Sequence, residues 1–156
     1  MRNFGLIGIK LGHSFSESYF SEKFKSEGIS DVQYSLCELD KVSDVLSLIA
    51  QEKLDGFNVT RPYKEEILPL LDELSPEAKE IQAVNTVKVV NGKLIGYNTD
   101  TVGFKKSLAA VFKPHHERAL ILGTGGASKA IAFTLEQLGV EFKMISRTPA
   151  EVEQGY

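Results

Sequence analysis

The sequence contains one cysteine and no long apolar run, and these two absences exclude several classes of protein. Cys37 has no partner for an internal disulfide, and no cysteine cluster is present for zinc, so we expect no metal site. No apolar stretch reaches the length of a membrane span, and the N-terminus lacks the long apolar segment and the cleavage site of a signal peptide. We therefore expect a cytoplasmic protein with no membrane partner.

An excess of positive charge is also absent. The formal net charge is -3 at pH 7, which gives no reason to expect a nucleic-acid partner. The contents of 42% hydrophobic and 25% charged residues are typical of soluble globular proteins. A chain of this length can bury roughly 70% of its unfolded surface, which is enough for a real core. Cys37 lies in the alternating segment VQYSLCEL, which predicts a core or half-buried strand thiol rather than a reactive one.

Strand-like and helix-like patterns alternate along the first part of the chain. Short apolar or alternating segments predict strands, and apolar residues at helical spacing predict helices. Because the residue before a proline is pushed out of the helical region, Arg61 marks the junction between the third strand and a helix that has Pro62 at its first position. The predicted strands are 4–9, 32–39 and 56–60, and the predicted helices are 16–29, 41–53 and one starting at 62.

The middle of the chain carries the strongest hairpin signal. Asn91-Gly92 suits a type I′ turn between the strand-like segments VNTVKVV and KLIGYN. Ser75, followed by Pro76, is a predicted helix N-cap. After the hairpin, the pattern predicts a helix over 100–112, a strand over 118–123, a glycine-rich turn that opens a helix over 123–139, and a strand over 140–147.

Strands that alternate with helices predict an α/β protein with parallel strands. The hairpin separates the first three strand-helix units from the last one, which indicates two units. We predict an N-terminal α/β domain with a β-hairpin over residues 1–99. Residues 100–156 then form a linking helix and the first part of a Rossmann-type nucleotide-binding domain.

The glycine-rich turn follows a strand and opens a helix, which is the context of a dinucleotide-binding fingerprint. Gly123 would make the tight turn, Gly125 would allow a pyrophosphate to approach, and the helix N-terminus would supply free N–H groups. Ser128 replaces the third glycine of the common pattern. The alternative is a purely structural turn.

The next strand ends in Ser146-Arg147-Thr148 instead of the acidic residue that would bind a ribose 2′-hydroxyl. An arginine about twenty residues after the glycines suits a 2′-phosphate, which favours NADP over NAD. The alternative for Arg147 is a solvated surface residue.

Three polar residues interrupt the apolar pattern between 54 and 67. Asn58 and Thr60 would face the same way at the end of a strand, and Lys64 follows in the first helical turn. A cation at a helix N-terminus is electrostatically unfavourable, which suggests a functional reason for its position. The alternative is that Lys64 points into solvent and the other two bond to loop backbone.

Two further polar sets have both a functional and a capping interpretation. Ser14 and Ser16 lie in the loop after the first strand, where open α/β sheets gather ligands, but either could simply cap the next helix. Asn85 and Asp100 flank the hairpin, and Asp100 could equally be an ordinary helix N-cap.

Six short motifs occur in one order over nearly the whole chain: GHSFS at 12–16, NVTRPYK at 58–64, AVNT at 83–86, GYNTD at 96–100, GTGGAS at 123–128 and SRT at 146–148. In these motifs the chain resembles the shikimate dehydrogenase family, which includes quinate/shikimate dehydrogenases. It departs from the usual pattern of that family at Lys10, Glu17, Phe20 and Ser146.

The resemblance implies NADPH-dependent reduction of 3-dehydroshikimate to shikimate in aromatic amino acid (chorismate) biosynthesis. It implies that Lys64 and Asp100 are the catalytic pair and that the serines hold the substrate carboxylate. The substrate-binding residues implied are Ser14, Ser16, Asn58, Thr60, Lys64, Asn85 and Asp100. The NADP-binding residues implied are Gly123, Gly125, Gly126, Ala127, Ser128, Ser146, Arg147 and Thr148.

Members of that family are considerably longer than this chain, so the resemblance implies an N-terminal portion with an incomplete coenzyme domain. On this basis we expect weak or absent turnover and self-association through exposed apolar sheet. One alternative is a non-catalytic module that keeps shikimate affinity. Others are a quinate/shikimate dehydrogenase, or a related amino acid or folate dehydrogenase-like enzyme.

Overall fold

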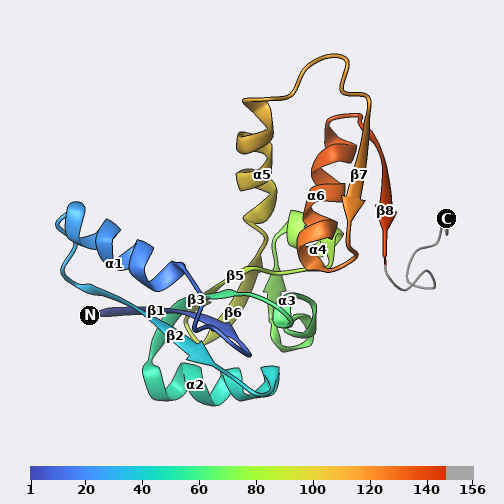
Figure 1. The fold of residues 1–156 in the computed structure, drawn as a ribbon. Coiled ribbons are helices and arrows are strands. Elements are labelled where there is room, and N and C mark those ends of the chain that lie inside the picture. The colour runs from blue at the N-terminus through green and yellow to red at the C-terminus, as the bar shows by residue number, and fades with distance from the viewer. Residues whose placement is uncertain (147–156) are drawn as a thin grey trace.

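The computed structural model describes residues 1–146, and two strand systems are arranged along this part of the chain (Figure 1). The strands are β1 (Arg2–Gly8), β2 (Val32–Glu38), β3 (Leu54–Val59), β4 (Glu73–Leu74), β5 (Thr86–Val90), β6 (Lys93–Tyr97), β7 (Arg118–Leu122) and β8 (Glu141–Ile145). The α-helices are α1 (Ser16–Ser26), α2 (Val45–Glu52), α3 (Tyr63–Glu66), α4 (Pro76–Ile81), α5 (Asp100–Ala109) and α6 (Gly126–Gln137). Two short 3₁₀ helices are η1 (Val42–Asp44) and η2 (Leu68–Leu70).

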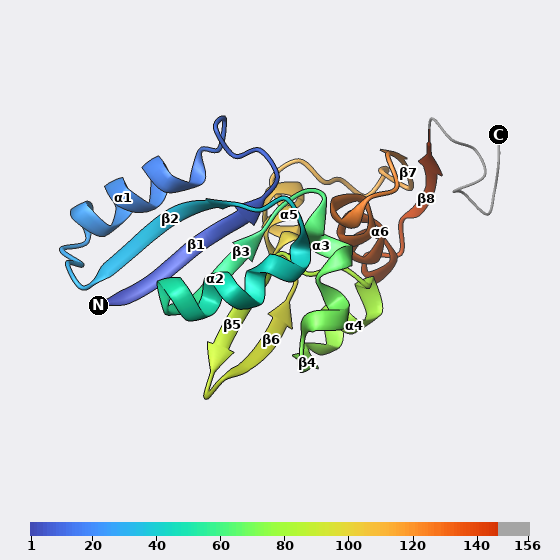
Figure 2. The same cartoon turned by 90° about the horizontal axis from the view of Figure 1, so that it is seen from below.

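The first strand system is a six-stranded mixed sheet in the order β2-β1-β3-β5-β6-β4. The predicted parallel pairing holds for β1 with β2 and with β3. The pairing reverses at β5, which runs antiparallel to β3. The two-residue turn between β5 and β6 makes these two strands an antiparallel hairpin. In Figure 1, α1 and α2 lie on opposite sides of the parallel strands, and in Figure 2 the hairpin extends away from them.

Local sequence signals explain several of these elements. Asn91 and Gly92 both have positive φ, 51° and 79°, as the predicted type I′ turn requires. The Oγ of Ser75 accepts a hydrogen bond from the backbone N of Ala78 at 3.2 Å, which confirms the predicted N-cap of α4. The main core lies under β3, where Phe57, Val59 and Tyr63 are almost fully buried.

Several helix boundaries differ from the prediction, and two of them, at α3 and α5, lie near the polar residues singled out above. Pro62 precedes α3, which begins at Tyr63 and has only four residues, and the Arg61-Pro62 peptide bond is cis. Helix α5 ends at Ala109 instead of residue 112. Phe112, beyond the end of α5, still packs on the core that β7, β8 and α6 share.

The second strand system is the parallel pair β7-β8, joined through α6. Helices α5 and α6 stand side by side against it (Figure 1). The segment RALILG at 118–123 is apolar on both faces, as a buried parallel strand usually is. Ile121 is buried, but the Leu120 and Leu122 side chains are 66% and 81% exposed, so one face of this pair is uncovered.

Candidate active site

Lys64 and Asp100 form the centre of the site. They lie 36 residues apart in the chain, one on α3 and the other at the first position of α5. The structure places Lys64 Nζ 2.7 Å from Asp100 Oδ2, with side chains only 15% and 32% exposed. The backbone N of Val84 donates to the carbonyl of Lys64 at 2.7 Å, which ties α3 to the segment before the hairpin. Lys64 therefore does not point into solvent.

The other oxygen of Asp100 is held by Asn85. The Nδ2 of Asn85 donates to Asp100 Oδ1 at 2.7 Å, and its Oδ1 accepts from the backbone N of Thr99 at 2.8 Å. The N-cap residue of α5 is Thr99, and the Asp100 backbone N donates to Asn98 Oδ1 at 3.1 Å. Asp100 therefore is not an ordinary N-cap, because both of its carboxylate oxygens bind side chains.

Asn58 lies on β3, and its carboxamide makes three hydrogen bonds. Its Oδ1 accepts from the Tyr34 hydroxyl at 2.9 Å, and its Nδ2 donates to Thr86 Oγ1 at 3.1 Å and to the Asn85 carbonyl at 3.3 Å. The alternative that Asn58 bonds to loop backbone is therefore correct in part, since one of its three partners is the Asn85 carbonyl. Thr60 follows β3 and is half-buried, and its backbone N donates to the Ile7 carbonyl at 3.0 Å.

The two serines lie at the start of α1. The Oγ of Ser14 accepts from the backbone N of Ser16 at 3.2 Å, but the N-cap residue of α1 is Phe15, so neither serine is the N-cap that the alternative proposed. Both serines are half-buried. The Ser16 hydroxyl lies beside the hydroxyl of Tyr34, so Tyr34 connects the serine loop to Asn58.

The glycine turn opens onto a cavity of about 980 Å³. On one side the cavity is lined by residues 122–128 with Ile145 and Ser146. On the other side it is lined by Arg61, Pro62, Lys64 and Glu65. Lys64 and the glycine turn therefore line a common cavity, although about sixty residues separate them in the sequence.

The conformation of the turn fits a dinucleotide. Gly123 has φ 123°, which a side-chain-bearing residue rarely adopts. A Cβ on Gly125, the residue before α6, would meet nothing within 4 Å, so the turn is open where a pyrophosphate would approach. Gly123, Gly125, Gly126, Ala127, Ser128 and Ser146 all line the cavity. Arg147 and Thr148 lie outside the described residues.

The turn also packs directly on the segment that carries Lys64. A Cβ on Gly126 would lie 3.0 Å from the Cβ of Lys64 and 3.1 Å from that of Ala83, so α6 approaches closely because this residue is glycine. Lys129, in the first turns of α6, forms an ion pair with Glu65 on α3. These contacts hold the glycine turn and the start of α6 against α3, which carries Lys64.

Tyr34, Thr86 and the Glu65-Lys129 ion pair are parts of the site that the sequence prediction did not single out. Only Tyr34 carried a usable signal, since a tyrosine inside a strand needs a hydrogen-bond partner for its hydroxyl.

Cys37 is half-buried on β2 as predicted, and burial raises the pKa of its thiol, which makes it a poor nucleophile. Over residues 1–146 no helix is both long enough and apolar enough to cross a lipid bilayer.

The fold and the site define a class of α/β proteins in which a lysine paired with an aspartate lines the same cavity as a glycine-rich turn that opens a helix. The family model of the shikimate dehydrogenase substrate binding domain matches residues 6–87, which is more than half of the chain. The chain belongs to the shikimate dehydrogenase family.

Individual relatives agree with this assignment. The shikimate dehydrogenase (NADP(+)) of Pyrococcus abyssi is 39% identical over 153 residues, covering 98% of this chain and 57% of that protein. The crystal structure of shikimate dehydrogenase from Aquifex aeolicus superposes with a TM-score of 0.89 at 38% identity, over 97% of this chain and 57% of that one. The Thermus thermophilus enzyme in complex with NADP(H) and shikimate has a TM-score of 0.85 at 38% identity, over 97% and 58%. The chain spans about half the length of the curated relatives it matches.

Proposed function

We propose that the protein is the substrate-binding and catalytic portion of an NADP-dependent shikimate dehydrogenase. The reaction is the reduction of 3-dehydroshikimate to shikimate, a step of aromatic amino acid biosynthesis in the cytoplasm. The observation that carries the proposal is the 2.7 Å ion pair of Lys64 and Asp100 beside the cavity that the glycine turn also lines. The similarity to an enzyme crystallised with NADP(H) and shikimate supports the choice of ligands.

In this proposal Lys64 is the proton donor. The coenzyme would supply hydride to the carbonyl carbon, and the ammonium of Lys64 would supply a proton to the carbonyl oxygen, on which negative charge develops. Asp100 holds the ammonium through one oxygen and is itself held by Asn85 through the other. In shikimate oxidation the same groups act in reverse, with Lys64 accepting the proton.

The remaining polar residues would bind the substrate without taking part in proton transfer. Ser14 and Ser16 would hold the carboxylate, and Asn58, Thr60 and Asn85 would hold the ring hydroxyls. Their half-buried positions support this assignment, because a ligand can reach them while bulk water competes less.

We place the coenzyme on residues 123–128 and Ser146, with Arg147 and Thr148 as the proposed 2′-phosphate contacts. The open position at Gly125 and the 12-residue helix α6 behind it support this placement. We also propose a domain boundary between 99 and 100. Phe104 and Leu108 of α5 support it, because they pack on the same core as Ile121, Leu135 and Val140 of the glycine-turn unit.

The test is shikimate oxidation with NADP by Lys64→Ala beside the unchanged chain. We expect the rate to fall by about 10²- to 10⁴-fold because the proton-transfer group is lost. Shikimate affinity, measured by calorimetry, should stay close to normal. Lys105→Ala is the matched control, since Lys105 is exposed on α5 and outside the cavity. An unchanged rate in Lys64→Ala, with measurable turnover by the unchanged chain, would refute the role of Lys64.

A second candidate function is a non-catalytic shikimate-binding module. This candidate is favoured because the proposed substrate residues all lie between positions 14 and 100. The glycine turn, in contrast, is accompanied only by the strand pair β7-β8 in the described residues. Separate titrations with shikimate and NADP distinguish the two. Binding of shikimate without any binding of NADP would favour the module.

Self-association is a further part of the proposal. The uncovered face of β7-β8 presents Leu120, Leu122 and Ile145 to solvent, at 66%, 81% and 42% exposure. Neither strand has a second neighbour in the described sheet, so each also offers unpaired backbone groups. Two copies of the chain would cover both the exposed apolar side chains of this face and the open edges by packing these pairs together.

A further inference from the structure

Tyr34 lies at the far end of a hydrogen-bond network that reaches the ion pair of Lys64. It is half-buried on β2, and its ring stacks on Phe20 of α1 with centroids 4.4 Å apart and planes at 23°. Its hydroxyl donates to Asn58 Oδ1 at 2.9 Å and lies beside the Ser16 hydroxyl. Burial raises the pKa of Tyr34 to about 12, so the hydroxyl keeps its proton for donation.

The network continues through four side chains. Asn58 Nδ2 donates to Thr86 Oγ1 at 3.1 Å, and Thr86 Oγ1 donates to Asn85 Oδ1 at 2.9 Å. Asn85 Nδ2 donates to Asp100 Oδ1 at 2.7 Å. Each donor therefore points toward the carboxylate, and aligned hydrogen bonds of this kind polarise and strengthen one another.

The orientation of the Asn58 carboxamide follows from chemistry at both ends. The Asn85 carbonyl can only accept, so the Asn58 group 3.3 Å from it must be the amino group. The oxygen of Asn58 then faces Tyr34, which must donate. Both amide hydrogens of Asn58 are used within the protein, and its one free capacity is a second lone pair on Oδ1.

We propose that Tyr34 is a positioning residue for substrate, because it holds Asn58 with Oδ1 as an acceptor for a hydroxyl of the ligand. This inference rests on the proposed function. A carboxamide rotated by half a turn would present its amino group instead, and the ligand hydroxyl would then have to accept. The Asn85 carbonyl sets this orientation and Tyr34 stabilises it, so together they favour ligands that can donate a hydroxyl proton at this point. Tyr34 also ties the position of Asn58 to that of Ser16.

The test is the dissociation constant of shikimate in Tyr34→Phe, measured by calorimetry. The substitution keeps the ring that stacks on Phe20 and removes only the hydroxyl. We expect shikimate to bind about 5- to 10-fold more weakly, because one hydrogen bond that fixes the acceptor is lost. Tyr19→Phe is the matched control, since Tyr19 lies on α1 and is 45% exposed, and its affinity should not change.

A double-mutant cycle separates positioning from general loosening of the structure. Tyr34 acts through Asn58, so Tyr34→Phe should have no further effect on shikimate affinity in an Asn58→Ala background. An affinity of Tyr34→Phe equal to that of the unchanged chain would overturn the inference. The inference would also be overturned if Tyr34→Phe reduced shikimate affinity as much in the Asn58→Ala background as in the unchanged chain. In either case the proposed function stands if the unchanged chain binds shikimate. If the unchanged chain does not bind shikimate, the proposed function fails and this inference fails with it.

Discussion

Gly125 and Gly126 are neighbours with different physical requirements. Gly126 has no room for a side chain, because a Cβ would lie 3.0 Å from Lys64 Cβ. Gly125 has room and a φ of -77°, which any residue can adopt, so nothing inside the protein requires glycine there. A ligand approaching the backbone is a reason for Gly125, and protein packing is the reason for Gly126.

Substitution of the two glycines with alanine is therefore expected to affect different properties, stability at Gly126 and NADP affinity at Gly125. Gly126→Ala should lower the free energy of unfolding by about 1 kcal/mol, because the added methyl crowds Lys64 and Ala83. Gly125→Ala should leave the free energy of unfolding nearly unchanged and weaken NADP binding by about tenfold or more. Urea unfolding and calorimetric titration with NADP provide the two measurements. Equal NADP affinity of Gly125→Ala and the unchanged chain would contradict a pyrophosphate at this position.

Tyr34 also predicts a pH dependence of stability. Burial raises its pKa to about 12, while an unfolded tyrosine ionises near pH 10. Between these values the unfolded chain has lost the proton and the folded chain retains it, so the free energy of unfolding falls as pH rises. Below about pH 10 both states are protonated and the contribution to stability is complete.

We expect the free energy of unfolding to fall more steeply between about pH 10 and 12 in the unchanged chain than in Tyr34→Phe. Urea unfolding at several pH values, followed by circular dichroism, measures the two slopes. The comparison with Tyr34→Phe removes the contribution of every other titrating group that the two chains share. Parallel slopes would show that Tyr34 ionises in the folded chain as it does in the unfolded one.

Among the elements, α4 links the hairpin sheet to the glycine-turn unit. Its residues Ala78 and Ile81 are buried, and Ile81 and Ala83 pack with Ala130 of α6. The helix has only six residues, which is too short to be stable without packing and capping. The Ser75 hydroxyl supplies that cap.

Ser75→Ala is therefore expected to lower the free energy of unfolding by about 1 kcal/mol, the usual effect of losing a side-chain N-cap. The melting temperature should fall by about 2–4 °C for a chain of this size. Ser47→Ala on the exposed face of α2 is the matched control and should change neither quantity appreciably. A melting temperature that is the same in both variants would contradict the contribution of the cap.

The hairpin and the N-cap were predictable from the sequence because each depends on a few adjacent residues. Asn91-Gly92 selects positive φ at both positions, and Ser75-Pro76 combines a cap with a first-turn proline. The short α3 was not predictable. Its length depends on where the chain must turn to bring Tyr63 and Ile67 into the core, and both are almost fully buried.

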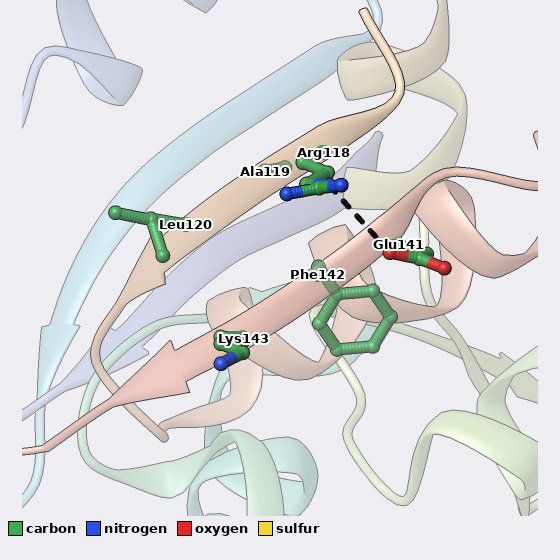
Figure 3. A pocket seen from close by; sticks show the side chains of 6 residues that line it. All are labelled: Arg118, Ala119, Leu120, Glu141, Phe142 and Lys143. Atoms are coloured by element: carbon green, nitrogen blue, oxygen red, sulfur yellow. Dashed lines mark ion pairs between the residues drawn. The ribbon is translucent and has the colours of Figure 1, made fainter. Parts of the chain in front are cut away.

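For the whole molecule, the main feature is the uncovered face of β7-β8. Residues at alternate positions point to it: Arg118, Leu120 and Leu122 on one strand, and Glu141, Lys143 and Ile145 on the other. The opposite face, with Ile121, Phe142 and Met144, packs on the helices. Figure 3 shows the hollow on this pair of strands, with the ion pair of Arg118 and Glu141 at one end.

Self-association through this face predicts that Leu120→Lys shifts the chain toward monomer. The lysine adds charge to an apolar patch next to Lys143, its register partner, so two copies would repel each other. Analytical ultracentrifugation across a concentration series measures the shift. Leu46→Lys on α2 is the matched control, because Leu46 is 51% exposed in the other unit. A chain that is monomeric at every concentration would refute the proposal.

The sequence by itself determined the order of strands and helices, the hairpin turn, the cap of α4 and the residues from which a site could be made. These features follow from local periodicity and from the backbone preferences of adjacent residues. Tertiary structure alone decided that α3 and α5 bring Lys64 to Asp100, that Tyr34 and Thr86 complete the network around Asn58, and that Gly126 lets α6 contact α3. The physical reason is that these contacts join segments distant in the chain, and their geometry depends on how the packed core positions each element.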